Sequence, residues 1–137
     1  MVGAVIRRAG HLTVERAQVS QSVADAERVT GALRGGLSVC VFPEGTFARP
    51  PGILPFRLGA FKSAVETGYP VIPVTIRGTR EILPADEWLP RPGPITVAVG
   101  TPLRPEGKGW PAMVRLRDQA RAAIARRAGE PTVERAA

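Results

Sequence analysis

The sequence predicts an α/β fold with a mixed, largely parallel sheet that is flanked by helices. Two short apolar runs, at residues 37–42 and 71–76, are rich in Val and have the length of strands buried on both faces. Apolar residues recur at helical spacing before, between and after these runs. Strands and helices that alternate along a chain favour parallel strand pairs joined by helices.

The first half of the chain contains three expected elements. Residues 12–15 alternate apolar and polar side chains after Gly10, which predicts a short strand. Ser22 and Asp25 resemble a capping box at the start of a helix, which Gly35 and Gly36 would close. Its apolar positions are Val23, Ala26, Val29, Ala32 and Leu33. The run LSVCVF at residues 37–42 then predicts a strand buried on both faces, with Cys40 as a small buried hydrophobe.

The second half continues the alternation. Residues 57–67 predict a helix that Gly68 ends. Residues 71–76 predict a second buried strand, although Pro73 within it indicates an edge or a bulge. A polar, turn-rich stretch covers residues 78–94, and residues 95–99 predict a third strand. A last helix is expected at residues 112–128, with Gly129 and Pro131 after it.

The size and composition of the chain limit its class. A length of 137 residues favours one domain, which we expect at residues 1–130, followed by a frayed tail at 131–137. One cysteine cannot form an internal disulfide, which fits a reducing compartment. No apolar stretch approaches the about 20 residues of a membrane-spanning helix. The net charge of +7 suits an anionic partner, or it serves solubility alone.

The sharpest motif is FPEGT at residues 42–46, directly after an expected strand. Ligands of open α/β sheets bind at the carboxyl ends of strands. Gly45 would allow close approach of a ligand to backbone amides that can point at an anion. Glu44 offers a carboxylate for a substrate hydroxyl, and Thr46 adds a hydroxyl donor. Taken alone, the same residues also fit an ordinary turn at the end of a strand.

Two further segments place this motif in a family. GHLTVER at residues 10–16 precedes FPEGT, and GYPVIPVTI at residues 68–76 follows it. In this order, the three segments resemble three of the four sequence blocks of the lysophosphatidic-acid (1-acylglycerol-3-phosphate) acyltransferase family. FPEGT is the most specific of these blocks. The resemblance spans residues 1–76 and implies a glycerolphosphate-acyltransferase-like fold.

The resemblance implies transfer of a fatty acyl group from acyl-CoA or acyl-carrier protein to the free hydroxyl of a lysophospholipid. Arg16 would hold the substrate phosphate, because a guanidinium gives bidentate, charge-assisted hydrogen bonds. Glu44 and Gly45 would position the glycerol moiety, with Thr46 at the margin of the site. Pro73 would shape the wall near the acyl donor, although a plain edge-strand proline is an equal alternative. The acyl donor is a co-substrate, and no bound cofactor is implied.

Two departures from the family pattern qualify this interpretation. Family members continue FPEGT with Arg-Ser, whereas here Phe47 and Ala48 follow, so that Arg49 would supply a displaced phosphate contact. The family's first block, His-x4-Asp, supplies a general base and the aspartate that orients it. His11 falls inside the second block, with Arg16 five residues on, so we assign no catalytic residue.

We therefore expect an N-terminally truncated, C-terminal portion of such an enzyme. A fragment, a misassigned start and a degenerate paralogue each explain the pattern. An inactive module that still binds phosphorylated lipid or acyl donor is the alternative function. We expect a cytoplasmic location, with peripheral placement on the inner face of the plasma membrane as a further option.

The arginines of the last expected helix could form a face that binds anionic lipid headgroups or a face that is simply solvated. They are Arg115, Arg117, Arg121, Arg126 and Arg127. The two tryptophans, Trp88 and Trp110, would lie at a membrane interface or cap the core. A nucleic-acid partner is not expected, since aromatic residues are only 5% and no nucleic-acid-binding motif is present. Neither a phosphate-binding Gly-x4-Gly-Lys loop nor a metal-ligand cluster occurs in the sequence.

Overall fold

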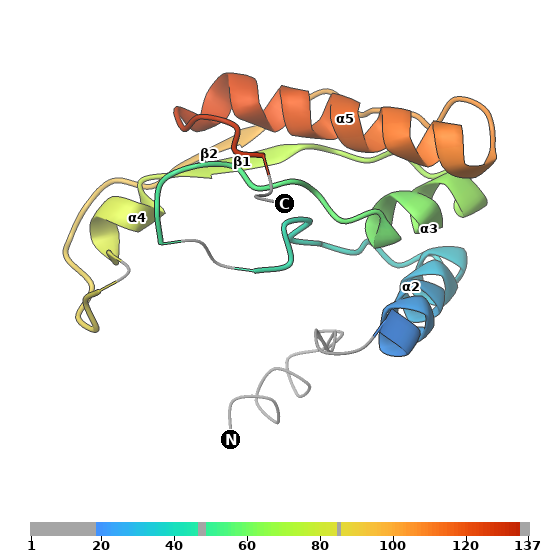
Figure 1. The fold of residues 1–137 in the computed structure, drawn as a ribbon, viewed down its shortest axis with the longest axis horizontal. Coiled ribbons are helices and arrows are strands. Elements are labelled where there is room, and N and C mark those ends of the chain that lie inside the picture. Colours follow the sequence, from blue (N-terminus) through green and yellow to red (C-terminus); the bar gives the residue numbers. More distant parts are fainter. Residues whose placement is uncertain (1–18, 47–48, 85, 135–137) are drawn as a thin grey trace.

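The computed structural model describes residues 19–46, 49–84 and 86–134. Figure 1 shows helix α5 lying along the β1–β2 ribbon, with α2 and α3 toward one end of the molecule and α4 at the other. The elements in chain order are α2 (Val19–Arg34), α3 (Gly59–Thr67), β1 (Val74–Arg77), α4 (Thr79–Ile82), β2 (Thr96–Val99) and α5 (Gly109–Ala128). The strand expected at residues 12–15 falls outside the described residues.

Helix α2 confirms the first predicted helix and ends as its two glycines predict. It begins at Val19, so Ser22 lies inside it and is not its cap. Gly36 has φ 82°, and its N–H donates to the Leu33 carbonyl at 2.9 Å. The Leu37 N–H donates to the Ala32 carbonyl at 3.1 Å. These two bonds form a Schellman motif, which satisfies carbonyls that a helix end otherwise leaves without donors.

Two buried hydroxyl groups join α2 to α3. Thr30 Oγ1 lies 3.0 Å from Ser63 Oγ, and both side chains are buried. Ser63 Oγ also donates to the Ala26 carbonyl at 3.1 Å. Because each buried hydroxyl has a partner, the contact avoids the cost of an unsatisfied polar group. The pair therefore fixes how α2 packs on α3.

The hydrophobic core lies between α3, α5 and the segment just before α3. Its buried members are Ile53, Phe56, Phe61, Ala64, Leu116 and Ala120. The rings of Phe56 and Phe61 are nearly parallel, with centroids 6.4 Å apart. Helices α3 and α5 thus confirm the two other predicted helices, and Gly68 and Gly129 follow them as expected.

The sheet in the described residues is a two-stranded antiparallel ribbon. Its register pairs Val74 with Val99 and Ile76 with Val97. The prediction of a largely parallel sheet is therefore wrong for this part of the chain. The strand predicted at residues 95–99 is confirmed as β2. The physical reason lies in the connection between the strands. Its helix α4 lies beyond the end of the ribbon (Figure 1), whereas parallel pairing requires a connection that crosses over a face of the sheet.

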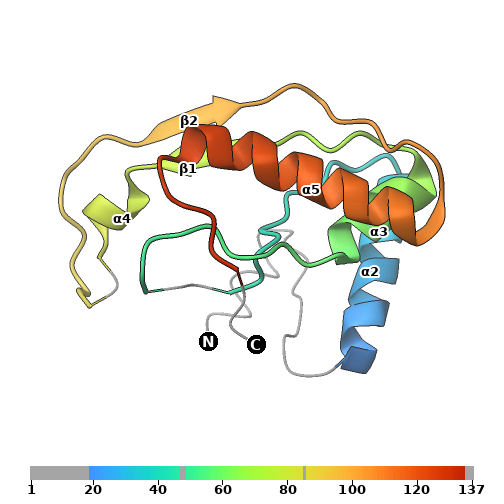
Figure 2. The same ribbon diagram turned by 45° about the horizontal axis from the view of Figure 1, so that its top comes forward.

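The two faces of this ribbon differ. Thr75 is buried on the face where α5 packs. Val74, Ile76, Val97 and Val99 lie on the opposite face and are exposed. Figure 2 shows α5 on one side of both strands. The expectation that residues 71–76 form a strand buried on both faces is thus wrong, because the described residues cover only one face of β1.

The segment at residues 37–42 also differs from its prediction. It is neither a strand nor buried, and Phe42 is 76% exposed. Cys40 is exposed with it, so its expected burial is wrong too. A strand needs a neighbour to receive its backbone hydrogen bonds, and no described segment pairs with residues 37–42.

The chain after α5 is held in place as far as Glu134. Ile53 forms a parallel bridge with Thr132. The Ile53 N–H donates to the Pro131 carbonyl at 2.8 Å, and the Val133 N–H donates to the Ile53 carbonyl at 3.0 Å. The expectation of a frayed tail is therefore wrong for residues 131–134. In the described ranges, no helix combines the length and the apolar character needed to cross a bilayer.

Candidate functional site

The FPEGT motif forms a tight turn at the end of residues 37–42. The Gly45 N–H donates to the Phe42 carbonyl at 3.1 Å. Gly45 has φ 68°, which lies in the left-handed region that glycine adopts without steric cost. The backbone conformation of the turn therefore favours glycine at position 45. A role for the turn in binding a ligand stays a prediction.

Two hydrogen bonds fix this turn to the loop that leads into α3. Glu44 Oε2 accepts a hydrogen bond of 2.9 Å from the Leu54 N–H. The Arg57 N–H donates to the Pro43 carbonyl at 2.8 Å. Hydrogen bonds to a carboxylate are stronger than those between neutral groups. The turn and residues 54–57 therefore form one unit, and Glu44 has a structural role within it.

Arg57 is the cation that the structure brings to the turn. A Cβ placed on Gly45 would lie only 2.6 Å from Arg57 Nε and 2.8 Å from its Cδ. The arginine side chain thus occupies the space that any other residue at position 45 would need. The sequence does not indicate this contact, because it predicts Arg57 as the first residue of a helix at residues 57–67. The helix begins two residues later, at Gly59.

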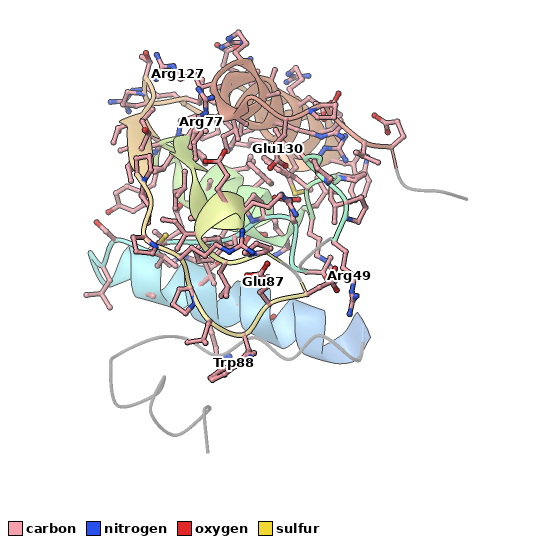
Figure 3. The ribbon with its side chains drawn as sticks, turned by 90° about the vertical axis from the view of Figure 1, so that its left-hand side faces the viewer. Arg49, Arg77, Glu87, Trp88, Arg127 and Glu130 are labelled. Carbon is pink, nitrogen blue, oxygen red and sulfur yellow. The ribbon has the colours of Figure 1, made fainter. Side chains whose placement is uncertain are left out.

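Arg49 has a different partner. Its Nη1 lies 2.6 Å from Asp86 Oδ1 in an exposed ion pair. The Arg49 carbonyl accepts a hydrogen bond of 3.0 Å from Arg80 Nη1. Figure 3 shows Arg49 at the edge of the molecule. Arg16, Phe47 and Ala48 lie outside the described residues, and Thr46 is exposed.

Pro73 is buried directly before β1. Its carbonyl accepts a hydrogen bond of 2.8 Å from the Gly100 N–H. Two residues earlier, Val71 forms an antiparallel bridge with Leu103. Pro73 therefore lies where the strand pairing is interrupted, which fits the edge or bulge that its lack of an N–H predicts. Its place near an acyl donor stays a prediction.

Two open depressions lie on the described surface, and the FPEGT turn lines neither of them. One depression lies between Leu103, Arg104 and the α5 residues Gln119 and Arg126. The other is lined by residues 55–59 with Arg117 and Glu134. Arg57 borders this second depression, so its side chain lies between the turn and a concave surface. No group of acidic, His or Cys residues in the described ranges could hold a metal ion.

Glu130 is a charged residue whose importance the sequence did not indicate. Its Oε1 accepts a hydrogen bond of 3.0 Å from Arg80 Nε, and its Oε2 accepts one of 2.8 Å from the Gly52 N–H. The Arg80 guanidinium lowers the pKa of this carboxyl, and the Gly52 N–H lowers it further, against the opposing effect of burial. Figure 3 shows Glu130 between α5 and α4.

The arginines of α5 do not form one solvated face. Arg121 is only 17% exposed at its side chain and donates to the Ile53 carbonyl at 3.1 Å and to the Val133 carbonyl at 2.6 Å. Arg127 donates to the Val99 carbonyl at 3.1 Å. By contrast, Trp88 and Trp110 are 85% and 64% exposed, so neither caps the core. Figure 3 shows Trp88 at the tip of its loop.

Sequence comparisons connect this chain with acyltransferases. A chloroplastic 1-acyl-sn-glycerol-3-phosphate acyltransferase of Brassica napus is 32% identical over 104 residues, which cover 75% of this chain and 30% of the relative. The corresponding enzyme of Chlamydomonas reinhardtii is 32% identical over 117 residues, which cover 85% of this chain and 34% of the relative. The chain thus spans about a third of the length of these relatives.

A structural comparison agrees with these relatives. The crystal structure of the 1-acyl-sn-glycerophosphate acyltransferase PlsC of Thermotoga maritima matches with a TM-score of 0.72 and 27% sequence identity. The match covers 91% of this chain and 48% of PlsC. Residues 1–77, which include the FPEGT turn and β1, match the sequence profile of the family described as Acyltransferase. This chain therefore belongs to the acyltransferase family.

Proposed function

We propose that this protein transfers a fatty acyl group from acyl-CoA or acyl-carrier protein to a lysophospholipid such as 1-acylglycerol 3-phosphate. The FPEGT turn carries the proposal. It matches the most specific block of the family, and Glu44 and Pro43 hold it rigidly against residues 54–57. The relatives named as 1-acyl-sn-glycerol-3-phosphate acyltransferases support the choice of acceptor.

In this reaction the acceptor hydroxyl oxygen attacks the thioester carbonyl carbon. An ester C–O bond forms, the C–S bond breaks, and the thiol of the acyl donor leaves. The hydroxyl proton passes through a general base to the departing sulfur. The family resemblance assigns that base to the histidine of a His-x4-Asp block, and this sequence has no such block. No residue of this chain is therefore assigned a catalytic role.

The acceptor-binding residues of the proposal are Arg16, Glu44, Gly45, Thr46 and Arg49. Arg16 would bind the phosphate by bidentate hydrogen bonds. Arg16→Ala should weaken binding of a lysophosphatidate far more than binding of an uncharged monoacylglycerol. Glu44 and Gly45 would shape the surface for the glycerol moiety. Arg49 would reach a phosphate only by leaving Asp86, and Pro73 would border the acyl donor.

A binding module without turnover is the second candidate, which the lack of a His-x4-Asp block favours. The 137-residue chain should be incubated with radiolabelled oleoyl-CoA or oleoyl-carrier protein and 1-oleoyl-lysophosphatidate. Labelled phosphatidate supports the transferase. No phosphatidate, together with calorimetric binding of 1-hexanoyl-lysophosphatidate in preference to 1-hexanoylglycerol, supports the binding module. If the chain shows no turnover and also no preference for the phosphorylated ligand, both candidates are overturned.

We also propose peripheral contact with an anionic membrane surface, which for a cytoplasmic protein means the inner face of the plasma membrane. The net charge of +7 and the exposed indole rings of Trp88 and Trp110 support this placement. Tryptophan is amphipathic and prefers the headgroup region of a bilayer. Basic residues add about 1 kcal/mol each when they lie near an anionic surface.

A further inference from the structure

We infer that Arg57 supplies a phosphate-binding cation to the FPEGT turn, in the place of the arginine that follows this motif in other family members. The inference rests on the proposed function, since it concerns the phosphate of the same acceptor. It deepens that function by naming a residue that the family pattern does not supply. Arg57 contacts the turn, and no carboxylate in the part of the chain that the structure describes is paired with it.

Arg57 is held beside the turn by its own backbone. Its N–H donates to the Pro43 carbonyl at 2.8 Å, and three residues earlier the Leu54 N–H donates to the Glu44 carboxylate at 2.9 Å. The loop and the turn are therefore joined at two points, and the backbone of Arg57 is one of them. A binding group held in this way loses less conformational entropy when a ligand arrives.

The side chain of Arg57 lies against the backbone of Gly45. The approach is so close that a Cβ at position 45 would meet both Nε and Cδ of Arg57. Gly45 therefore provides a φ of 68° and also the room for this guanidinium. A planar guanidinium presents N–H donors side by side, a geometry that suits the oxygens of a phosphate monoester.

The charge of Arg57 is available to a ligand. The residue is exposed, and no carboxylate of the described residues forms an ion pair with it. Arg49, by contrast, is ion-paired with Asp86 at 2.6 Å. Recruiting Arg49 would break that pair, whereas recruiting Arg57 would break no ion pair between described residues. The residue that stands directly after the motif, Phe47, carries no charge.

Calorimetric titration of 1-hexanoyl-lysophosphatidate and of 1-hexanoylglycerol into the 137-residue chain tests this inference. Arg57→Gln should weaken binding of the phosphorylated ligand at least tenfold and leave binding of the uncharged ligand within twofold. Arg57→Lys, which keeps a cation but loses the bidentate geometry, should recover part of the affinity. Arg91→Gln, which removes an exposed arginine paired with Glu87, is the matched control and should bind both ligands as the wild type does.

The other outcomes would overturn the inference. If Arg57→Gln keeps the full preference for the phosphorylated ligand, the role of Arg57 is overturned and the proposed function is not. Equal losses of affinity for both ligands would assign Arg57 a structural role and overturn the inference. The same holds if Arg57→Gln lowers the unfolding temperature and Arg57→Lys restores that temperature without restoring affinity. A larger loss in Arg49→Gln than in Arg57→Gln returns the role to Arg49. A wild-type chain without preference for the phosphorylated ligand overturns this inference together with the proposed acceptor.

Discussion

The Glu130 carboxylate and the Arg80 guanidinium are separated by 50 positions in the sequence, and they meet with Nε 3.0 Å from Oε1. Glu130 lies just after α5, and Arg80 belongs to α4. The same carboxylate also accepts the Gly52 N–H. One side chain thus joins three segments that are distant in the sequence, and it does so from a partly buried position.

This ion pair predicts a pH-dependent contribution of Glu130 to stability. Arg80 holds the pKa of Glu130 below its ordinary value in the folded chain, so the unfolded chain binds the proton more readily. The stabilisation is therefore full above about pH 4.5 and is lost as pH falls through the lower, folded pKa. Glu130→Gln should lower the free energy of unfolding by roughly 0.5–1 kcal/mol at pH 7. Chemical denaturation at several pH values would measure the difference.

The difference between wild type and Glu130→Gln should shrink below about pH 4.5 and also in 1 M salt. Glu87→Gln removes a carboxylate from an exposed ion pair with Arg91 and serves as the control. Its effect should stay within about 0.5 kcal/mol. A Glu130→Gln difference that does not change with pH would contradict the electrostatic explanation and leave only a packing effect.

The FPEGT turn predicts opposite effects for two glycine substitutions. Gly45→Ala should lower the free energy of unfolding by about 1–3 kcal/mol, because it strains φ 68° and displaces Arg57. Gly31→Ala lies inside α2 with no atom near its new Cβ, and it should raise stability by about 0.5–1 kcal/mol. Denaturant midpoints of both variants test the pair. Equal shifts in the same direction would refute the turn geometry.

The packing of the core predicts that shortening the Leu116 side chain strongly lowers the free energy of unfolding. This side chain is fully buried between α3 and the segment at residues 53–56. Leu116→Ala should lower the free energy of unfolding by about 2–5 kcal/mol through lost burial and the resulting cavity. Leu89→Ala, at an exposed position, is the matched control and should change it by less than about 0.5 kcal/mol. A small effect at Leu116 would mean that α5 does not pack as described.

The exposed tryptophans predict a fluorescence response to lipid. With Trp88 and Trp110 open to solvent, the emission maximum should resemble that of free tryptophan. Vesicles of phosphatidylglycerol should shift it to shorter wavelength, whereas vesicles of phosphatidylcholine should not, because the chain carries a charge of +7. Trp88→Phe and Trp110→Phe, measured singly, assign the shift to one ring. An emission maximum that neither lipid changes would argue against peripheral membrane contact.

Local sequence signals predicted the three longer helices and the residues at which they end, but they missed the short helix α4 within the stretch expected to be turns. The glycine pair after α2, Gly68 after α3 and Gly129 after α5 each lie at the predicted helix end. These signals act within a few residues, so a sequence shows them directly. The start of α2 was missed because Ser22 and Asp25 fit a capping box equally well inside a helix.

Features that depend on distant partners were not predictable in this way. The apolar run at residues 37–42 has the composition of a buried strand, but composition does not say which segment would pair with it. The direction of the ribbon depended on the path between β1 and β2. At the candidate site, the sequence identified the turn and Gly45. It did not identify Arg57, because the contact depends on how residues 54–57 fold back onto the turn.

The exposed face of the β1–β2 ribbon has a consequence for handling the purified chain. Four β-branched side chains gather there, at Val74, Ile76, Val97 and Val99. Beyond the single ladder between β1 and β2, the ribbon has no third strand among the described residues. Exposed apolar faces and unpaired strand edges promote reversible self-association as protein concentration rises. Light scattering at increasing concentration should therefore detect oligomers well before precipitation, and mild detergent should disperse them.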